Sequence, residues 1–416
     1  MKNNPLIKTL LNLRGNSRAC VYTEPLWGIP FSLYSPFVSV YMAALFLTDK
    51  QIGLVASISM LFKALSALLS GALTDKFGRK ITTLISDSIA FSIPCLLWAF
   101  SRNVWWFMLA AALNGVMMVS ENSWTCLLVE DADKKQMVKI YSLIHMTGQL
   151  AVVFAPLAGL LVSNLTIVPA MRIIYLFSFF SMTAKFILLY KYCDETQTGI
   201  VRKAETSGMS LFKIMRGYGR IFKKVMASPG MVLALTMSAV FNITGMISGN
   251  FFGLFISGSL LIPQQFLAYF PILRSLIIAV FLFGVQSKLS RFGYRFPMLI
   301  GVFIYIVSLA ALILSPKESL VMPLVCVFLE ACAHGLVMPR KDSAVAILIE
   351  PDERARIYAT MNFIVLGCGI PFGYLAGWLS DMDRRFPFLL GIALYVLVFT
   401  VIAACKKLLA HKDMAS

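Results

Sequence analysis

Charged residues are scarce in this sequence. Asp, Glu, Lys and Arg make up 14% of the 416 residues, whereas apolar residues make up 59% and the mean hydropathy is +0.79. Soluble domains are about one-quarter charged, and a chain this apolar has too little polar surface to cover itself in water. The composition therefore excludes a disordered chain, a soluble nucleic-acid-binding domain and a secreted disulfide-stapled module. It favours a polytopic helical membrane protein.

Residues that carry enzyme or metal chemistry are also few. There are three histidines, and the eight cysteines are scattered without a CxxC pair, so we interpret the cysteines as buried small hydrophobic residues. Neither a GxSxG nor a GxxxxGK[ST] motif is present. We therefore expect a protein that is not an enzyme or an ATP-driven pump, with no metal and no cofactor beyond a proton gradient. The N-terminal residues lack the apolar core of a signal peptide and predict a short amphipathic helix on the cytoplasmic surface.

Long apolar runs recur along the chain, and each is long enough for a transmembrane helix of about 20 residues. A polar stretch at 192–229 divides them into six and six. The sequence thus predicts a six-helix bundle with its N-terminal segment (1–191), a linker (192–229) and a second six-helix bundle (230–416). The twelve predicted spans cover residues 26–48, 51–73, 81–100, 104–129, 140–163, 171–191, 230–257, 264–286, 296–314, 319–340, 356–380 and 386–405.

Basic residues alternate from one set of loops to the other. One set holds 26 Lys and Arg residues and the alternate set holds six. By the positive-inside rule, both termini and the linker are cytoplasmic in a multi-pass protein of the plasma (inner) membrane. Because topology explains the net charge of +17, no nucleic-acid partner is needed.

The linker carries an apolar periodicity with basic residues between the apolar positions. The pattern predicts an amphipathic helix lying on an anionic leaflet, with a calmodulin-like partner site as the alternative. The apolar positions are Leu211, Met215, Tyr218, Phe222 and Val225.

Two segments of the chain are alike. LNGVMMVSENSWTCLLVE (113–130) aligns without a gap with AHGLVMPRKDSAVAILIE (333–350), and both end in a glutamate. Two similar halves of six spans are typical of a pseudo-symmetric transporter whose binding site lies near the midplane between the halves.

The loop after the second span, GALTDKFGRK (71–80), resembles the G-x-x-x-D-x-x-G-R-K/R signature of the major facilitator superfamily (MFS). The matching residues are Gly71, Asp75, Gly78, Arg79 and Lys80. The resemblance implies the MFS fold, transport by alternating access, and a gating role for this loop. We expect Asp75 to pair with Arg79 or with a helix N-terminus, and Asp87 to belong to the same network.

A second, partial resemblance lies in the fifth span. GQLAVVFAPLAG (148–159) is similar to the antiporter motif of the superfamily at Pro156 and Gly159, although Ala155 stands where the motif has glycine. It predicts a helix kink at these residues and leaves export open.

Ionisable residues inside the spans are expensive, about 2.5–3.5 kcal/mol each on insertion scales, and are therefore candidate functional residues. We expect Lys185 to snorkel to the end of its span. The other candidates are Lys63, Asp87, Glu121, His145, Arg274, Glu330, His334, Arg340, Lys341 and Asp342.

Glu121 and Lys341 occupy equivalent positions in the two repeats, near mid-bilayer. We predict that they face each other across a central cavity, and that Glu330 and His334, on one helical stripe, form a proton-titrating pair. This arrangement is loosely similar to that of the sugar–proton symporters of the superfamily. A structural ion-pair network is the alternative. Stacking and hydrogen bonds to a solute are expected from Trp27, Tyr34, Asn122, Trp124 and Gln149.

These features together predict a monomeric, proton-coupled secondary active transporter. The number of mid-membrane charges favours a small polar or anionic organic solute, such as a sugar or organic acid. A proton-driven exporter of drugs or amphiphilic metabolites is the alternative, supported by the partial antiporter motif and the 22 methionines.

Overall fold

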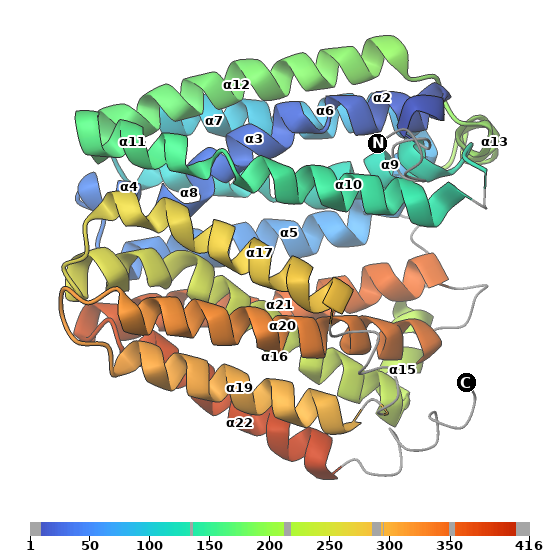
Figure 1. Ribbon diagram of the computed structural model, residues 1–416. Helices are drawn as coiled ribbons and strands as arrows, with labels where there is room; N and C mark the ends of the chain where they lie inside the picture. Colours follow the sequence, from blue (N-terminus) through green and yellow to red (C-terminus); the bar gives the residue numbers. More distant parts are fainter. Residues whose placement is uncertain are drawn as a thin grey trace.

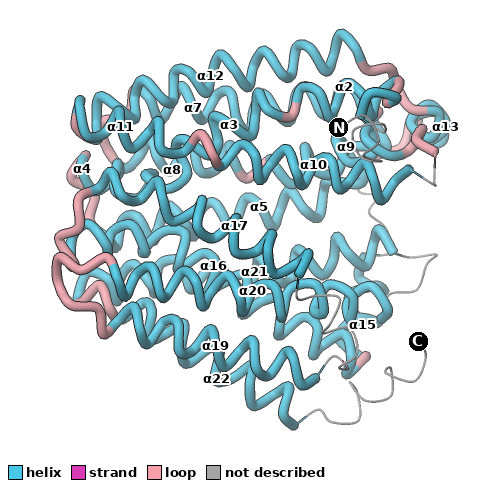
Figure 2. The backbone as a smooth tube through the Cα atoms, in the orientation of Figure 1, coloured by secondary structure: helices cyan, strands magenta, loops and turns pink. Residues whose placement is uncertain are grey.

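The computed structural model describes residues 10–133, 136–211, 218–284, 293, 295–348 and 354–404. These residues form helices and no strands, and the loops gather at two opposite ends of the molecule (Figure 2). Figure 1 follows the helices through the chain. The first part of the chain forms α2 (Gly15–Thr23), α3 (Pro25–Tyr34), α4 (Val38–Ala44), α5 (Asp49–Phe77), α6 (Arg79–Asp87), α7 (Ile93–Ala99), α8 (Val104–Asn114), α9 (Met117–Val129), α10 (Met137–Val152), α11 (Ala155–Leu165) and α12 (Ile167–Tyr192). The rest forms α13 (Gln197–Glu205), α15 (Tyr218–Ala227), α16 (Pro229–Leu254), α17 (Tyr269–Gly284), α19 (Arg295–Ile313), α20 (Val321–Leu348), α21 (Arg354–Met382) and α22 (Phe386–Ala404).

The described helices assemble into twelve membrane-crossing segments. Eleven are continuous apolar stretches of at least 18 residues. The first is divided into α3, a 3-10 turn at Ser35–Phe37 and α4, because Pro30 and Pro36 remove backbone donors. The predicted all-α fold of a polytopic membrane protein is confirmed.

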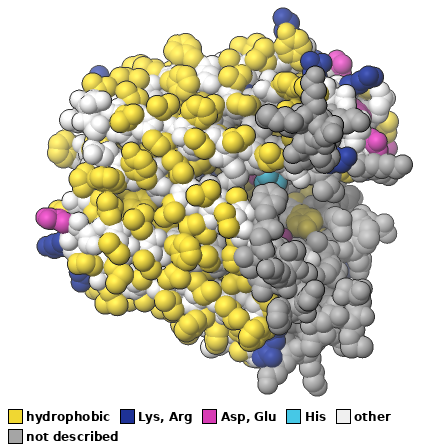
Figure 3. Space-filling view, in the orientation of Figure 1, with side chains coloured by type: hydrophobic (Ala, Val, Ile, Leu, Met, Phe, Trp, Pro, Cys, Tyr) yellow, Lys and Arg dark blue, Asp and Glu magenta, His cyan; other side chains and the backbone are white. Residues whose placement is uncertain are grey.

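The two halves of the chain form two units in space. The N unit comprises α2–α12 and the C unit comprises α16–α22 (Figure 1). We call the end of the molecule that carries α13 and α15 the linker end, and the opposite end, with the loops near residues 46, 101, 261, 317 and 384, the distal end. Apolar side chains cover the face in Figure 3, with charged ones toward the two ends, as expected of a surface that meets lipid.

The N-terminal helix differs from its prediction. Residues 1–9 of the predicted amphipathic helix lie outside the described residues, and α2 continues into α3 and packs against α9 and α12. Cys20 and Val21 are buried in a cluster with Leu128 and Leu189. A helix with apolar contacts on this scale belongs to the N unit.

The linker divides its contacts between the two units. Helix α13 lies against α5, whereas α15 packs on α16 and α21. The buried stripe of α15 consists of Ile221 and Val225, while Phe222 is exposed. The buried face of α15 therefore includes Ile221 in place of the predicted Phe222, because this helix packs against protein. Residues 212–217, with Met215, lie outside the described residues.

The distal end is closed by direct contact between α5 and α21. The backbones of Gly53, Gly373 and Gly377 meet there, so that a Cβ added at Gly377 would lie 2.7 Å from the carbonyl oxygen of Asp49. Arg384 holds the Asp49 carboxylate with its Nε at 2.8 Å. Glycines permit this close approach of backbones.

Candidate functional site

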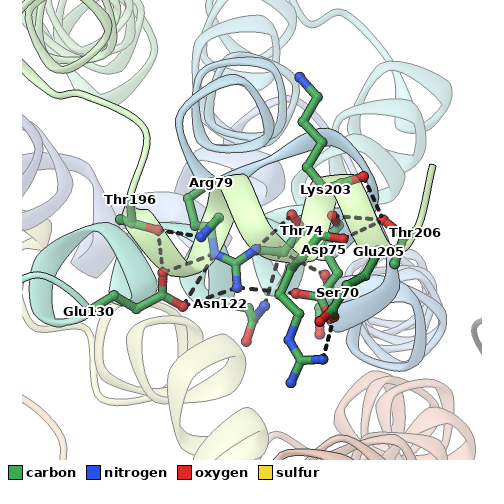
Figure 4. A network of polar contacts seen from close by, with 12 residues as sticks. Ser70, Thr74, Asp75, Arg79, Asn122, Glu130, Thr196, Lys203, Glu205 and Thr206 are labelled. Atoms are coloured by element: carbon green, nitrogen blue, oxygen red, sulfur yellow. Dashed lines mark hydrogen bonds and ion pairs between the residues drawn. The ribbon is translucent and has the colours of Figure 1, made fainter.

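The signature loop between α5 and α6 forms a compact ion-pair network (Figure 4). Asp75 pairs with Arg79 at 3.1 Å, as the sequence predicts. Arg79, 3% exposed, also donates from Nε to Glu130 at the end of α9 at 3.0 Å. Thr196 donates to the same Glu130 carboxylate. Arg79 thereby joins α5, α6 and α9.

Glu195, just before α13, caps the start of α6. Its carboxylate accepts the backbone N–H groups of Arg79 at 2.8 Å and Lys80 at 3.2 Å. A carboxylate at a helix N-terminus satisfies orphan donors and complements the helix dipole. Gly78 has φ of +88°, and a Cβ there would collide with the Glu195 carboxylate. The glycine of the signature is thus required both by backbone angle and by space.

Two other candidates are placed differently with respect to this loop. Asn122 donates to Thr74 at 3.0 Å, beside the Arg79 network. Asp87 was expected in the network but is buried away from it, where it accepts a hydrogen bond from Ser120. Asp87 follows Arg79 by eight residues, about two helical turns along α6, and lines the interior of the N unit.

A cavity of about 270 Å³ lies inside the N unit, between α3, α6, α9, α10 and α12. It combines charged, indole and apolar walls. Its lining residues are Glu24, Trp27, Asp87, Phe91, Met117, Ser120, Glu121, Trp124, Ile144 and Lys185. Such a mixture of apolar walls with a few convergent polar groups is typical of sites for organic ligands.

Lys185 lies at the centre of this cavity's charges. Its Nζ is 2.8 Å from the Glu24 carboxylate, and the residue is 5% exposed. The prediction that Lys185 snorkels to the membrane surface is therefore wrong. An acidic partner buried within the same unit holds the ammonium inside, which a distance from the end of the span could not reveal.

Two tryptophans flank the same ammonium. The Lys185 Nζ lies 5.6 Å from the ring centroid of Trp27 and 5.3 Å from that of Trp124. Both indole N–H groups are buried, with no hydrogen-bond partner among the described residues. The contact that the structure gives Trp27 and Trp124, predicted from the sequence to bind solute, is with the protein's own cation, Lys185.

Glu121 also lines the N-unit cavity, but its partner differs from the predicted one. It interacts electrostatically with Lys63 of α5, whereas Lys341 pairs with Asp342 at 3.0 Å. The repeat gives both residues the same depth but does not decide which neighbour each side chain meets. Each of them finds its partner within its own unit.

This pairing gives a testable prediction. In a double-mutant cycle on thermal stability in detergent, Glu121→Gln and Lys63→Met should couple by about 0.5–3 kcal/mol, because the two charges interact electrostatically within the N unit. Glu121→Gln and Lys341→Met should be additive within about 0.5 kcal/mol. Coupling between Glu121→Gln and Lys341→Met, with additivity between Glu121→Gln and Lys63→Met, would instead support the predicted pairing across the two units.

The C unit holds a second charged group. Arg274 of α17 pairs with Glu330 of α20 at 3.3 Å, and His334, one turn further along α20, interacts electrostatically with Arg274. Tyr305 and Tyr395 stack at 4.8 Å and interact electrostatically with Arg274 and Glu330. Arg274 thus interacts with both residues of the predicted Glu330–His334 stripe.

A separate cavity of about 330 Å³ lies nearer the linker end of the C unit. Lys341 and Asp342 line it together with Asn242, whose amide oxygen is buried without a partner among the described residues. Arg340 is buried and donates to the carbonyl of Leu336 on its own helix at 3.0 Å.

The remaining candidates divide between packing and exposure. Tyr34 is buried against Trp98 and Tyr175, an aromatic cluster. His145 and Gln149 are exposed on α10 and do not line the N-unit cavity.

The break between α10 and α11 falls just before Pro156, in agreement with the predicted kink. A Cβ on Gly159 would lie 2.8 Å from the carbonyl oxygen of Gln265, so this glycine serves contact between the units.

Glu24 is the residue that sequence reasoning missed. It precedes the first predicted span by two positions, whereas in the structure it joins α2 to α3 as a buried residue. Pro25, directly after it, indicates a helix start at this position, and the sequence carries no signal that Glu24 is buried.

In the described residues, membrane-spanning helices form two units, each with a cavity that combines charged and apolar walls, an arrangement typical of a multi-pass membrane transporter rather than of an enzyme. The model of the Major Facilitator Superfamily matches residues 27–374, and the chain belongs to this family.

Curated relatives match part of the chain. The multidrug resistance protein MdtG of Yersinia enterocolitica is 26% identical over 197 residues, which cover 46% of each chain. MdtG of Salmonella paratyphi A is 30% identical over 144 residues, 33% of this chain and 35% of the relative. The chain thus spans about half the length, or less, of these relatives.

Solved structures match over nearly the whole length. The nucleoside transporter NupG aligns with a TM-score of 0.70 at 17% identity, over 95% of this chain and 100% of that one. The POT family transporter PepTSo aligns with a TM-score of 0.72 at 13% identity, over 96% and 99%. At these identities the likeness concerns the fold.

Proposed function

We propose that the protein is a proton-driven exporter of amphiphilic organic compounds in a bacterial inner membrane. The N-unit cavity carries this proposal, because Phe91, Met117 and Ile144 offer apolar walls beside the indoles and the charged groups. The names of the multidrug resistance relatives support the same solute class. Export of such compounds was the alternative prediction from the sequence. The apolar walls of this cavity suit an amphiphilic solute better than a sugar.

A polar or anionic solute is the second candidate. Arg274 and His334 in the C unit, with Lys341 in its own cavity, favour an anion. In this reading the C unit, rather than the N-unit cavity, makes the main contacts with the solute.

Alternating access provides the mechanism. In this structure Gly53, Gly373 and Asp49 close the distal end, and both cavities lie nearer the linker end than the distal end. With a cytoplasmic linker, this arrangement would load solute from inside the cell and release it when the distal contact opens.

Transport by the purified protein in liposomes tests the proposal. Under an imposed pH gradient we expect accumulation of an amphiphile such as ethidium, abolished by a protonophore, with no accumulation of glucose, uridine or benzoate. Protein-free liposomes provide the control. Gradient-driven accumulation of benzoate or glucose, with no movement of ethidium, would favour the second candidate.

The sidedness of the chain is a separate prediction. Single cysteines at Ser207 (linker end) and Ser319 (distal end) should react with a membrane-impermeant thiol reagent from opposite sides, since the basic loops predict a cytoplasmic linker. Intact cells should label Ser319→Cys at once and Ser207→Cys after lysis. Labelling of both from outside would contradict the topology.

A further inference from the structure

We propose that the ammonium of Lys185 is an internal occupant of a binding site for organic cations, and that a cationic solute binds by taking its place while the lysine gives up a proton. This inference rests on the proposed function, because it names the solute class and the proton carrier of the same N-unit cavity.

The surroundings of the ammonium form a cation cage. The Nζ atom lies 2.8 Å from the Glu24 carboxylate and between the rings of Trp27 and Trp124, at 5.6 and 5.3 Å from their centroids. Indole faces with a nearby carboxylate are the groups that recognise quaternary ammonium ligands. The cavity of about 270 Å³ adjoins this cage, with Phe91 and Met117 on its wall. It would therefore accept the apolar part of the same ligand.

The ammonium of Lys185 does not neutralise all the negative charge around the cage. Asp87 interacts electrostatically with both Lys185 and Glu24, so two carboxylates share one ammonium. Glu121, the third acid of the cavity, interacts with Lys63. The titratable groups that interact with Lys185 are Glu24 at the α2–α3 junction, Asp87 of α6 and Cys20 of α2. Glu121 of α9 and the apolar Ile144 of α10 line the same cavity.

The solute cation cannot join the ammonium in the cage, because the Lys185 Nζ already occupies the position at the Glu24 carboxylate and over both indole rings. The charge balance is kept if Lys185 becomes a neutral amine when the solute enters. One N–H bond of the ammonium then breaks, its electron pair stays on Nζ, and the proton passes to water on the linker side. The solute cation takes over the carboxylates and the indole faces.

The return half of the cycle follows from the same competition. Once the distal end opens, the cation leaves and a proton from that side binds the free amine of Lys185. One proton enters for each cation exported, so that no net charge crosses the membrane. A pH gradient alone would drive transport, and a membrane potential alone would not.

Binding by the purified protein in detergent tests the exchange. The probe is benzyltrimethylammonium, a permanent cation, and the uncharged benzyl tert-butyl ether is its control. We expect titration calorimetry in buffers of different ionisation enthalpy to show one proton released per probe bound. Because the probe competes with a proton, its affinity should rise about tenfold per pH unit. The ether should bind far more weakly and release no proton.

Variants of Lys185 separate the two parts of the proposal. Lys185→Met leaves the cage without its occupant, so the probe should bind more tightly, independently of pH and without proton release. Lys185→Arg keeps a charge that is not given up, and should weaken binding by more than about tenfold. Lys191→Met, on the exposed end of α12, is the matched control and should bind as the natural protein does. If Lys185→Met does not fold, Glu24→Gln with Lys185→Met removes both partners and should show the same loss of pH dependence.

The outcomes also separate this proposal from the proposed function. Equal binding of the ether, or a pH dependence that persists in Lys185→Met, would overturn the cage even if liposomes export amphiphiles. Cation binding with release of one proton, found in a protein that exports no amphiphile, would support the cage and refute the exporter.

Discussion

A single methyl group at Gly377 is expected to abolish transport. In the closed distal end, the added Cβ of Gly377→Ala would lie 2.7 Å from the Asp49 carbonyl oxygen and 2.9 Å from the Gly53 Cα. Both neighbours are backbone atoms, so no side-chain rotation relieves the contact. Overpacking of this kind costs about 1–3 kcal/mol, and every 1.4 kcal/mol shifts a two-state population about tenfold. The variant should favour the state in which the distal end is open.

The measurement combines transport with accessibility. A cysteine at Met60, buried under the distal contact, should react faster with an impermeant thiol reagent added on the distal side in Gly377→Ala than in the natural background. Gly367→Ala is the matched control on the same helix, because a Cβ there has nothing within 4 Å, and it should transport normally. Unchanged labelling with normal transport in Gly377→Ala would show that the helices part more easily than the contact suggests.

Removal of Arg79 should have the largest effect on stability. Arg79→Ala leaves the partly buried Glu130 carboxylate without its cation, and breaking a buried pair from one side costs about 3–5 kcal/mol. Asp75 also loses its partner. We expect a large fall in the thermal midpoint and slow transport. Solute affinity in the surviving protein should stay nearly unchanged, since the N-unit cavity does not include Arg79.

Two variants check this interpretation. The double change Arg79→Ala with Glu130→Ala should recover much of the lost stability, because the less exposed of the two unpaired carboxylates is removed, whereas Asp75, with a side chain 34% exposed, remains in contact with water. Arg202→Ala removes an ion pair with Glu205 in which both side chains are 55% exposed, and should change the midpoint little. A loss in Arg202→Ala as large as in Arg79→Ala would point to general disturbance of the linker.

The sequence predicts the architecture well because the length of an apolar run and the position of a motif can be read directly along the chain. Most predicted spans end within a few residues of the helices, and the loop at 71–80 lies where the signature indicates. The division of the first span at Pro36 also follows from local chemistry.

The partners of the charged residues within the spans were harder to predict. The position of Lys185 along its helix gives a depth, but only the packing of α3 against α12 brings Glu24 to it. In the same way, the repeat aligns Glu121 with Lys341 but contains no information about the rotation of α9 toward Lys63. The position of a residue along its span fixes its distance from the membrane surface, whereas the side chain that it meets depends on how the helices pack.

The location of the ion pairs has a consequence for the energy of switching. Glu24 with Lys185, and Arg274 with Glu330, each lie inside one unit and travel with it intact. The pair of Asp49 and Arg384, in contrast, joins the two units at the distal end. Opening that end separates these two charges and exposes them to the solution outside. Salt on the distal side should therefore favour the open state by screening their attraction, which makes the resting conformation sensitive to the ionic strength of the cell's surroundings.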